Sequence, residues 1–395
     1  MSEYSIEKFV HDTIDTDEQI DDDTNLIESG LLDSLDFLKL ISAIEAEYGI
    51  TVDFDEIDPN ELTRFDNLVS SCERLVTEKS EVKTKKVSSS EDIAEIIFIG
   101  NGRPMRKVLS EVEDRPEIQF TELYTDESSD SEIVQYANSL DIEVQNTQNL
   151  LSSGPDYFSS PPDYIFNVNS TVIFPEELLT EPKEGCVNLH PGRLPEYAGL
   201  HTHQWALIND EEEFGATLHW MTKEIDAGDI IYRETFPIEE DDNGLKLFLR
   251  SIDSGTELVK RALKQIEKNE KLPSQPQDTS RRRVYRSKDI PDGEIDWSLK
   301  TREVYNFVRA ADYGPFQSPT YDPYTQIDGT EVIMRNVKTA NIDGLPPGQI
   351  RILRGSLYIG TGDGAVEIIK TEINGNSMAG TDVTNKLKLE SGMEI

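Results

Sequence analysis

Cysteine is nearly absent from this chain of 395 residues. The two cysteines, Cys72 and Cys186, stand far apart and lack the spacing of a metal site, which fits a reduced cytoplasm. Long apolar runs are missing too, because no stretch approaches the roughly 18 apolar residues of a membrane span. The opening residues MSEYSIEKFV lack the basic start and apolar core of a secretory signal. We therefore expect a cytoplasmic protein with no membrane partner.

Basic side chains are scarce as well. Lys and Arg number 38 against 77 Asp and Glu, which gives a formal net charge of −39. Such a charge disfavours binding to nucleic acid, including tRNA, and to anionic membranes. The first 79 residues carry 22 acidic and 5 basic side chains. This acidity suits docking onto basic partner surfaces, although plain solubility explains it equally well.

Apolar periodicity divides the chain into segments of different character. Residues 1–79 predict an all-α unit, with helices in SIEKFVHDTI, SLDFLKLISAIEAEYG and DNLVSSCERLVTE. The stretch SEVKTKKVSSSED has no apolar periodicity, so residues 80–94 predict a flexible linker. Residues 95–285 alternate strand patterns such as EIIFIG, IQFTELYT and DYIFNVNST with helical ones, which indicates a parallel, doubly wound sheet. Residues 286–395 hold a helix and short strands between Gly-containing turns, and predict a small β-barrel.

A serine opens the leucine-rich helix in LLDSLDFLKL. Ser34 can act as the helix cap, and that alone explains its presence. The surrounding hexad GLLDSL at 30–35, together with the acidic helical composition of residues 3–79, resembles acyl and peptidyl carrier proteins. The resemblance implies a four-helix bundle whose Ser34 hydroxyl receives 4′-phosphopantetheine from a phosphopantetheinyl transferase. Capping and carrying are compatible, since a helix N-terminus favours a phosphate.

Four of the five histidines, His190, His201, His203 and His219, gather in one window. His190 with the His201-x-His203 pair offers three zinc ligands, but no familiar metal motif surrounds them, so we expect no metal. Earlier, FIGNGRPM follows a strand and contains a G-x-G, as dinucleotide sites do. The third glycine is replaced by Met105, and a tight strand-to-helix turn explains the pair adequately.

A sharper pattern lies in CVNLHPGRLPEYAGLHTHQW and KEIDAGDII. Asn188-x-His190 at a strand end, then Leu194-Pro195 and a loop containing Asp226, resemble the folate-dependent formyltransferases. The resemblance runs from about residue 95 to the C-terminus, with an OB-like β-barrel after GEIDWSLKTREVYNFVRAADYGPF. It implies a formyltransferase that uses N10-formyltetrahydrofolate. Where many relatives have a serine, this chain has Gly192, as sugar and peptide-synthetase members do.

Formyl transfer explains the residue types of this motif. An Asn amide can donate to the oxygen that becomes negative, a His can accept the proton of the attacking amine, and a carboxylate can orient that His. The resemblance assigns these roles to Asn188, His190 and Asp226, and it prefers Asp226 to Asp229 because a small residue and glycine follow. It also implies a folate pocket. The residues assigned to that pocket are Val172, Ile173, Phe174, Leu194 and Ile225.

Several functions remain open at this point. We expect N-formylation of a small-molecule amine, specifically an aminoacyl group tethered to the Ser34 arm, in natural-product assembly. The partners would then include an amino-acid-loading enzyme or synthetase modules. Alternatively, the carrier thiol itself accepts the formyl group, or a free amino sugar nucleotide does. A catalytically dead scaffold is disfavoured by the intact Asn188, His190 and Asp226.

Overall fold

The chain divides into two compact units. The computed structural model describes residues 5–14, 20, 21, 23–27, 29, 31, 32, 34–48, 50, 52, 62–79, 93–112, 115, 117–129, 131–152, 157, 158 and 160–395. Unit 1 comprises Met1–Ala198, Gly215–Thr235 and Leu249–Arg283, and unit 2 comprises Gly199–Phe214, Phe236–Phe248 and Val284–Ile395. Of the predicted linker at 80–94, residues 80–92 lie outside the described residues, as do Gly30 and Asp33 of the carrier hexad. The predicted boundaries at 79, 94 and 285 stay predictions.

The N-terminal segment is helical, as predicted. Its described helices are α1 (Ile6–Thr13), α2 (Ser34–Tyr48) and α4 (Phe65–Lys79). The side chain of Ser5 caps α1 by accepting from the backbone N–H of Lys8 at 3.3 Å. Apolar side chains at helical spacing are fully buried in these helices: Val10, Phe37, Ile41, Ile44 and Leu68. Ser34 is the first residue of α2, where the sequence places it.

A seven-stranded sheet forms the centre of unit 1. Its strand order is β3-β2-β1-β4-β5-β7-β8, so the order reverses between β1 and β4. The strands are β1 (Ala94–Gly100), β2 (Ile118–Thr125), β3 (Glu143–Asn146), β4 (Tyr164–Val168), β5 (Gly185–His190), β7 (Glu213–Trp220) and β8 (Ile230–Pro237). Ligands of such sheets bind beyond the carboxyl ends of strands near the reversal. Asn188 and His190 lie at that end of β5.

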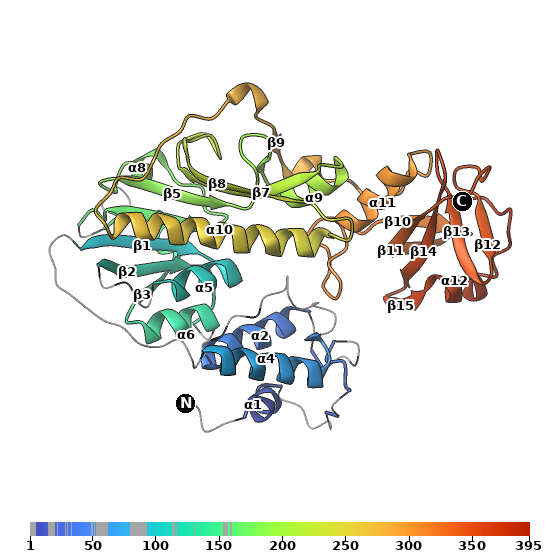
Figure 1. The fold of residues 1–395 in the computed structure, drawn as a ribbon, viewed down its shortest axis with the longest axis horizontal. Coiled ribbons are helices and arrows are strands. Elements are labelled where there is room, and N and C mark those ends of the chain that lie inside the picture. Colours follow the sequence, from blue (N-terminus) through green and yellow to red (C-terminus); the bar gives the residue numbers. More distant parts are fainter. Residues whose placement is uncertain are drawn as a thin grey trace. The chain divides into compact units, whose positions relative to one another are not determined.

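Alternate side chains of the central strands face two different cores. Ile96 and Phe98 join a cluster that includes Leu258 and Val259 of α10 (Gly244–Ile266), whereas Ile97 belongs to a second cluster on the other side. Figure 1 shows α10 lying along the sheet. The shorter helices between strands are α5 (Gly102–Ser110), α6 (Glu132–Ser139), α7 (Thr147–Ser152) and α8 (Glu176–Leu179). Both faces are therefore covered, as in other doubly wound sheets.

The sheet is mixed rather than purely parallel. The pairs of β1 with β2, β1 with β4, β2 with β3 and β4 with β5 are parallel, but β7 pairs antiparallel with β5. The prediction of an all-parallel sheet was wrong at this edge. A parallel strand needs a crossover that returns the chain to the same end of the sheet. The reversed direction of β7 sets His219 opposite Asn188, which matters for the site below.

The C-terminal segment is a β-sheet domain, as predicted. Its six strands are β10 (Tyr324–Ile327), β11 (Thr330–Ala340), β12 (Ile350–Leu353), β13 (Ser356–Gly360), β14 (Ala365–Ile373) and β15 (Asn376–Ala379). The remaining elements among the described residues are β6 (Ala198–Gly199), α9 (Thr202–Ile208), η1 (Thr279–Arg281), β9 (Val284–Tyr285), η2 (Ser287–Asp289), α11 (Thr301–Ala310) and α12 (Gly380–Lys386). Helix α11 buries Val304 and Val308 against this sheet.

Candidate active site

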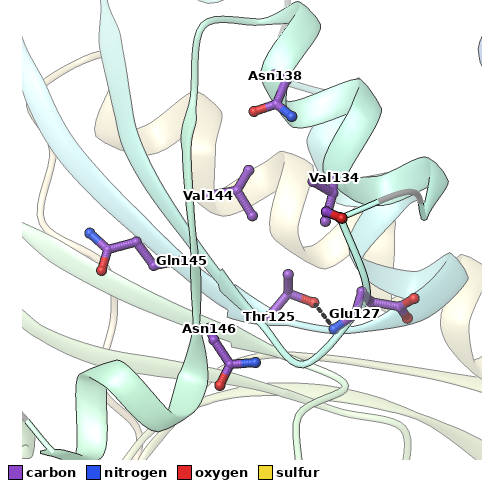
Figure 2. Close-up of a pocket in the computed structure, with 8 residues that line it drawn as sticks. Thr125, Glu127, Val134, Asn138, Val144, Gln145 and Asn146 are labelled. Atoms are coloured by element: carbon purple, nitrogen blue, oxygen red, sulfur yellow. Dashed lines mark hydrogen bonds between the residues drawn. The ribbon is translucent and has the colours of Figure 1, made fainter.

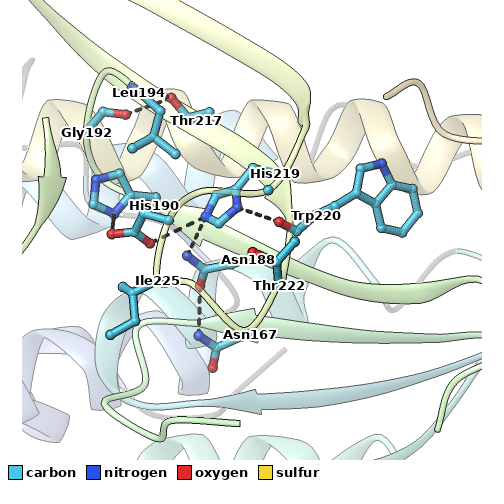
Figure 3. A network of polar contacts seen from close by, with 12 residues as sticks. Asn167, Asn188, His190, Gly192, Leu194, Thr217, His219, Trp220, Thr222 and Ile225 are labelled. Atoms are coloured by element: carbon cyan, nitrogen blue, oxygen red, sulfur yellow. Dashed lines mark hydrogen bonds and ion pairs between the residues drawn. The ribbon is translucent and has the colours of Figure 1, made fainter. Parts of the chain in front are cut away.

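Three neighbouring strands present a row of polar side chains. Asn167 on β4 is paired in register with Asn188 on β5, and Asn188 is paired with His219 on β7. Nδ2 of Asn167 donates to Oδ1 of Asn188 at 2.7 Å, and Nδ2 of Asn188 lies 3.0 Å from Nε2 of His219 (Figure 3). The backbone register of the sheet thus holds the Asn188 amide from both of its ends.

The hydrogen bonds of His219 determine its tautomer. Nδ1 lies 2.7 Å from the backbone carbonyl of Trp220, which can only accept, so Nδ1 carries the proton. Nε2 is then the acceptor for one N–H of Asn188. The other N–H of Asn188 has no acceptor among the described residues, and Asn188 is only half-buried. A donor of fixed orientation therefore remains for a ligand.

His190 is the last residue of β5, and its ring is buried. Nε2 lies 2.6 Å from the carbonyl of Tyr197 and must donate to it, which leaves Nδ1 as a bare nitrogen in the neutral ring. Nδ1 lies 3.6 Å from Oδ2 of Asp226. A proton accepted at Nδ1 would therefore face a carboxylate, which stabilises the charged imidazolium.

Asp226 lies between the two histidines in the loop that joins β7 to β8. Its Oδ1 is 3.5 Å from Nε2 of His219, and its side chain is 8% exposed. The backbone of Asp226 is left-handed, with φ of 54°. Asp229 serves elsewhere, because its Oδ2 accepts from the hydroxyl of Ser274 at 2.5 Å. Asn188, His190 and Asp226 are thus brought together as the motif predicts.

The turn after His190 is braced by Thr217 on β7. The Thr217 hydroxyl donates to the carbonyl of Gly192 at 2.7 Å and accepts from the N–H of Leu194 at 3.2 Å (Figure 3). Gly192 leaves room for the ring of His190. A Cβ at position 192 would lie 2.5 Å from Nε2 of His190 and 2.7 Å from the carbonyl oxygen of Tyr197. The glycine that departs from many relatives has a local packing reason.

The five predicted folate residues fall into two groups. Ile173 and Ile225 project apolar side chains into solvent, with exposed fractions of 72% and 54%. Phe174 and Leu194 are buried in the protein interior, and Val172 packs against the core cluster that contains Phe174. Ile173 and Ile225 thus offer side-chain surface to a ligand, whereas Phe174 and Leu194 could contribute only through their backbone. The half-buried Val172 is intermediate between these two groups.

No role was predicted from the sequence for His219, Asn167 or Thr217. His219 was visible as one of four clustered histidines, but its contact with Asn188 depends on the pairing of β5 with β7. Such pairing joins residues 31 positions apart. The sequence signal for this contact was an Asn-x-His motif on one strand followed by a single His on a later strand.

The described part of the chain holds no group of three or more His, Cys, Asp or Glu that could bind a metal, so it contains no candidate zinc site. His203 is buried and contacts the hydroxyl of Tyr313 through Nε2. Burial lowers the pKa of His203 to about 3, with a smaller contribution from His201. A neutral core histidine is the simplest interpretation.

The glycines of FIGNGRPM are explained by packing and capping. A Cβ at Gly100 would lie 2.2 Å from the carbonyl oxygen of Val168, so β1 and β4 need a glycine there. The N–H of Gly102 donates to Oε1 of Glu127 at 3.1 Å. A carboxylate thus occupies the position at which a dinucleotide site would hold a phosphate.

A separate cavity of about 340 Å³ lies beside Glu127. Figure 2 shows its lining from β2, β3 and α6, including Thr125, Asn138 and Gln145. None of the Asn188, His190 and Asp226 side chains lines this cavity. It carries neither of the histidines that face Asp226, and its lining offers no proton-transfer pair.

Comparison with known proteins identifies the family. The family model of formyl transferases matches residues 118–263, and the model of their C-terminal domain matches residues 290–388. A methionyl-tRNA formyltransferase from Synechococcus sp. (strain JA-3-3Ab) is 31% identical over 233 residues, which cover 56% of this chain and 70% of that enzyme. The chain belongs to the formyl transferase family. The predicted resemblance and the predicted class of enzyme are confirmed.

Further matches agree with this assignment. The methionyl-tRNA formyltransferase of Caldanaerobacter subterraneus subsp. tengcongensis is 30% identical over 53% of this chain, and the match spans 65% of that enzyme. A solved N-formyltransferase from Helicobacter canadensis, in complex with folinic acid and dTDP-3-aminofucose, shares the fold. Its TM-score is 0.54 at 20% identity, over 70% of this chain and 98% of that one.

The N-terminal segment matches a different family model. The model of the phosphopantetheine attachment site covers residues 8–65. The predicted fusion of a carrier to a formyltransferase is therefore confirmed, and the predicted formyl-folate donor and phosphopantetheine arm agree with these matches. Across the described residues, no helix is both long and apolar enough to cross a membrane.

Proposed function

We propose that the chain is an N10-formyltetrahydrofolate-dependent N-formyltransferase. The observation that carries this proposal is the buried Asp226 carboxylate between Nδ1 of His190 and Nε2 of His219, next to the fixed amide of Asn188. The formyl donor supplies an electrophilic carbon whose oxygen gains negative charge during transfer. Every other step falls to side chains of this chain.

Asn188 is proposed as the donor to that oxygen. Its amide cannot rotate freely, because Asn167 holds Oδ1 and His219 accepts from Nδ2. A donor that is oriented before the reaction needs no reorganisation when charge develops, and this is the usual source of a large rate effect. The remaining N–H of Asn188 is suited to this task.

His190 is proposed as the base for the attacking amine. Its Nδ1 faces Asp226, while its Nε2 proton is committed to the carbonyl of Tyr197. A proton arriving at Nδ1 creates a buried ion pair with Asp226 rather than an isolated charge. His190 then returns this proton to N10 of the leaving tetrahydrofolate as the bond between N10 and the formyl carbon breaks. Asp226 is thereby proposed to orient His190 and to stabilise its charged form.

The residues present fit a flat, partly apolar donor. Ile225 directly precedes Asp226 and exposes more than half of its surface, and Ile173 is still more exposed. We propose that these two side chains pack against the folate ring. Val172, Phe174 and Leu194 would contribute through their backbone, since the side chains of Phe174 and Leu194 are buried and that of Val172 packs against the core.

Ser34 is the proposed attachment residue for 4′-phosphopantetheine. It is the first residue of the 15-residue helix α2, whose N-terminus favours a phosphate. We propose that the arm carries an aminoacyl group and that its amine is the formyl acceptor. A tethered acceptor would reach an effective concentration of the order of millimolar. The partners would be a phosphopantetheinyl transferase and an amino-acid-loading enzyme or synthetase modules in natural-product biosynthesis.

A free amino sugar nucleotide is the second candidate acceptor. The fold is shared with an N-formyltransferase from Helicobacter canadensis whose structure holds dTDP-3-aminofucose. Transfer to the carrier thiol is a third outcome. A tRNA acceptor is disfavoured by the net charge of −39.

The proposal also covers details of the fold and the location of the protein. We propose that the carrier is a four-helix bundle and that the C-terminal strands close into an OB-like barrel. We also retain the cytoplasm as the site of action, since both cysteines are free thiols.

The test of the proposed function is transfer from N10-formyltetrahydrofolate to an amine, followed by mass spectrometry of the product. Alanine at Asn188, His190 or Asp226 should each lower kcat about a hundredfold or more. Because the three residues act together, a double variant should fall little below the worst single one. Additive losses, or a near-normal His190→Ala enzyme, would argue for a different mechanism.

A further inference from the structure

The loop that carries Asp226 is held by a segment about fifty residues later in the chain. The peptide of Gln275 exchanges two hydrogen bonds with Ile230, at 2.8 and 3.0 Å. Nε1 of Trp220 donates to the carbonyl of Pro273 at 3.0 Å. These contacts fix the two ends of the loop, at the close of β7 and the start of β8. They do not reach its tip, where Ile225 and Asp226 lie.

Two side chains from the same later segment hold the tip. Nε2 of Gln277 donates to the carbonyl oxygens of Asp226 at 3.0 Å and of Gly228 at 2.6 Å. Because both partners are carbonyls, the amide orientation of Gln277 is unambiguous. The guanidinium of Arg282 donates to the carbonyl of Ile225 through Nη2 and to Oε1 of Glu224 through Nη1, the latter at 2.7 Å. Three backbone carbonyls at the tip thus receive side-chain donors.

The backbone of Asp226 needs such support. A φ of 54° is left-handed, a conformation that costs a residue other than glycine about 1 kcal/mol or more. An alternative backbone would rotate the Cα–Cβ bond and turn the carboxylate away from its present place. In its present place the carboxylate lies 3.5 Å from Nε2 of His219 and 3.6 Å from Nδ1 of His190. Contacts of this length are weak as hydrogen bonds.

The burial of the two side chains agrees with a structural task. Arg282 is 15% exposed although it carries a charge, whereas its partner Glu224 is 70% exposed. An ion pair with so exposed a carboxylate contributes little, so the bond of Arg282 to the Ile225 backbone matters more. Oε1 of Gln277 is buried without a hydrogen-bond partner among the described residues, which indicates that its Nε2 contacts determine where the amide sits.

We propose that Gln277 and Arg282 are positioning residues for Asp226. They hold the Ile225–Asp226 tip in its left-handed conformation, so that the carboxylate faces His190 and His219 and Ile225 stays exposed beside it. The consequence for catalysis rests on the proposed function. The positioning itself does not, and it can be measured in the protein without substrate.

The first experiment is NMR of the full chain with 15N-labelled histidine, of which the sequence has five. Gln277→Met removes both donors and keeps the side-chain length. It should shift the ring nitrogen signals of His190 and His219 and leave that of His203 in place. Ser274→Ala is the matched control, since it breaks only the bond to Asp229 in the same segment. Unchanged signals of both His190 and His219 in Gln277→Met would overturn the proposal.

The second experiment separates positioning from general stability. Loss of two hydrogen bonds should lower kcat about ten- to a hundredfold in Gln277→Met, with a smaller change of KM. Arg282→Lys keeps a donor and should retain more activity than Arg282→Met. When Asp226→Ala is already present, Gln277→Met should cost nothing further, whereas a merely structural role would still lower the rate.

The two experiments fail in distinguishable ways. If the wild-type chain transfers no formyl group, the proposed function is wrong, and the NMR comparison still decides the positioning. If transfer occurs and Gln277→Met matches Ser274→Ala in both signals and kcat, the function stands and the positioning proposal is wrong. A Gln277→Met chain that does not fold would leave Arg282→Met and Arg282→Lys to decide by the same histidine signals.

Discussion

The amide of Asn188 donates a hydrogen bond to Nε2 of His219 across 3.0 Å, and the β5–β7 register sets the two residues directly opposite each other. His219 in turn is fixed by its bond to the Trp220 carbonyl. The proposed oxyanion donor is therefore oriented by a histidine that never has to contact substrate. This relation leads to the first prediction.

His219→Ala should lower kcat about tenfold, because the Asn188 amide loses one of its two anchors and a net hydrogen bond is worth roughly 1 kcal/mol. His219→Gln offers an acceptor at a similar distance and should recover part of the loss. Steady-state kinetics of both variants, with unfolding curves as the stability control, provide the check. A His219→Ala enzyme with wild-type kcat would show that Asn188 needs no such support.

Gly192→Ala should impair the enzyme by displacing the ring of His190 rather than by changing a contact with the substrate. The added Cβ would lie 2.5 Å from Nε2 of His190 and 2.7 Å from the Tyr197 carbonyl oxygen, so the ring must move out of its bond to that carbonyl. We expect a loss of kcat of at least tenfold, corresponding to about 1.4 kcal/mol. Gly344→Ala is a control for the added methyl group, because nothing lies within 4 Å of a Cβ there, and its positive φ of 68° makes it the more strained backbone of the two. Equal activity of Gly192→Ala and wild type would contradict the packing explanation.

The formyltransferase motif was sufficient to predict that Asn188, His190 and Asp226 meet, and strand patterns placed β1, β2 and β4 correctly. His219 could not be given a role, because its place follows from which strands pair and in which direction. Asn167 was missed for the same reason. The exposure of Ile173 beside the buried Phe174 could not be predicted either, since both residues are apolar in the sequence. The whole fold decides which strands pair when they are far apart in the sequence. It also decides whether a side chain faces the core or the solvent.

The buried His203 should make stability depend on pH. Its folded pKa of about 3 lies below the ordinary value of 6.5, and burial is the main cause. Between pH 3 and pH 6.5 the unfolded chain therefore binds a proton at His203 that the folded chain does not bind. The contribution of the neutral His203 ring to the free energy of unfolding is complete above pH 6.5 and is lost as pH falls toward 3. Between pH 7 and pH 5 the loss from this group should be about 2 kcal/mol.

His203→Phe removes the titrating group and should flatten this part of the profile. Urea unfolding curves, followed by tryptophan fluorescence at several pH values, compare the variant with wild type. The difference between the two proteins isolates His203 from the acidic side chains that titrate in the same range. An identical loss of stability in both proteins between pH 7 and pH 5 would mean that His203 binds its proton as readily in the folded chain as in the unfolded chain.

Ser34→Ala should abolish attachment of the arm without unfolding the chain. Treatment with coenzyme A and a broad-specificity phosphopantetheinyl transferase should add the arm mass to wild type only. Ser29→Ala is a nearby control that should still be modified. An arm mass that persists in Ser34→Ala would move the attachment to another residue.

In the proposed function, the site of Asn188, His190 and Asp226 formylates an amine held on the Ser34 arm. The most direct measurement loads the arm from an aminoacyl coenzyme A, adds N10-formyltetrahydrofolate, and follows the intact protein and the released aminoacyl product by mass spectrometry. We predict one formyl group on the amine nitrogen, retained after release, and almost none in His190→Ala. A formyl group that appears equally in His190→Ala, or only on the unloaded thiol where hydroxylamine removes it, would contradict the claim.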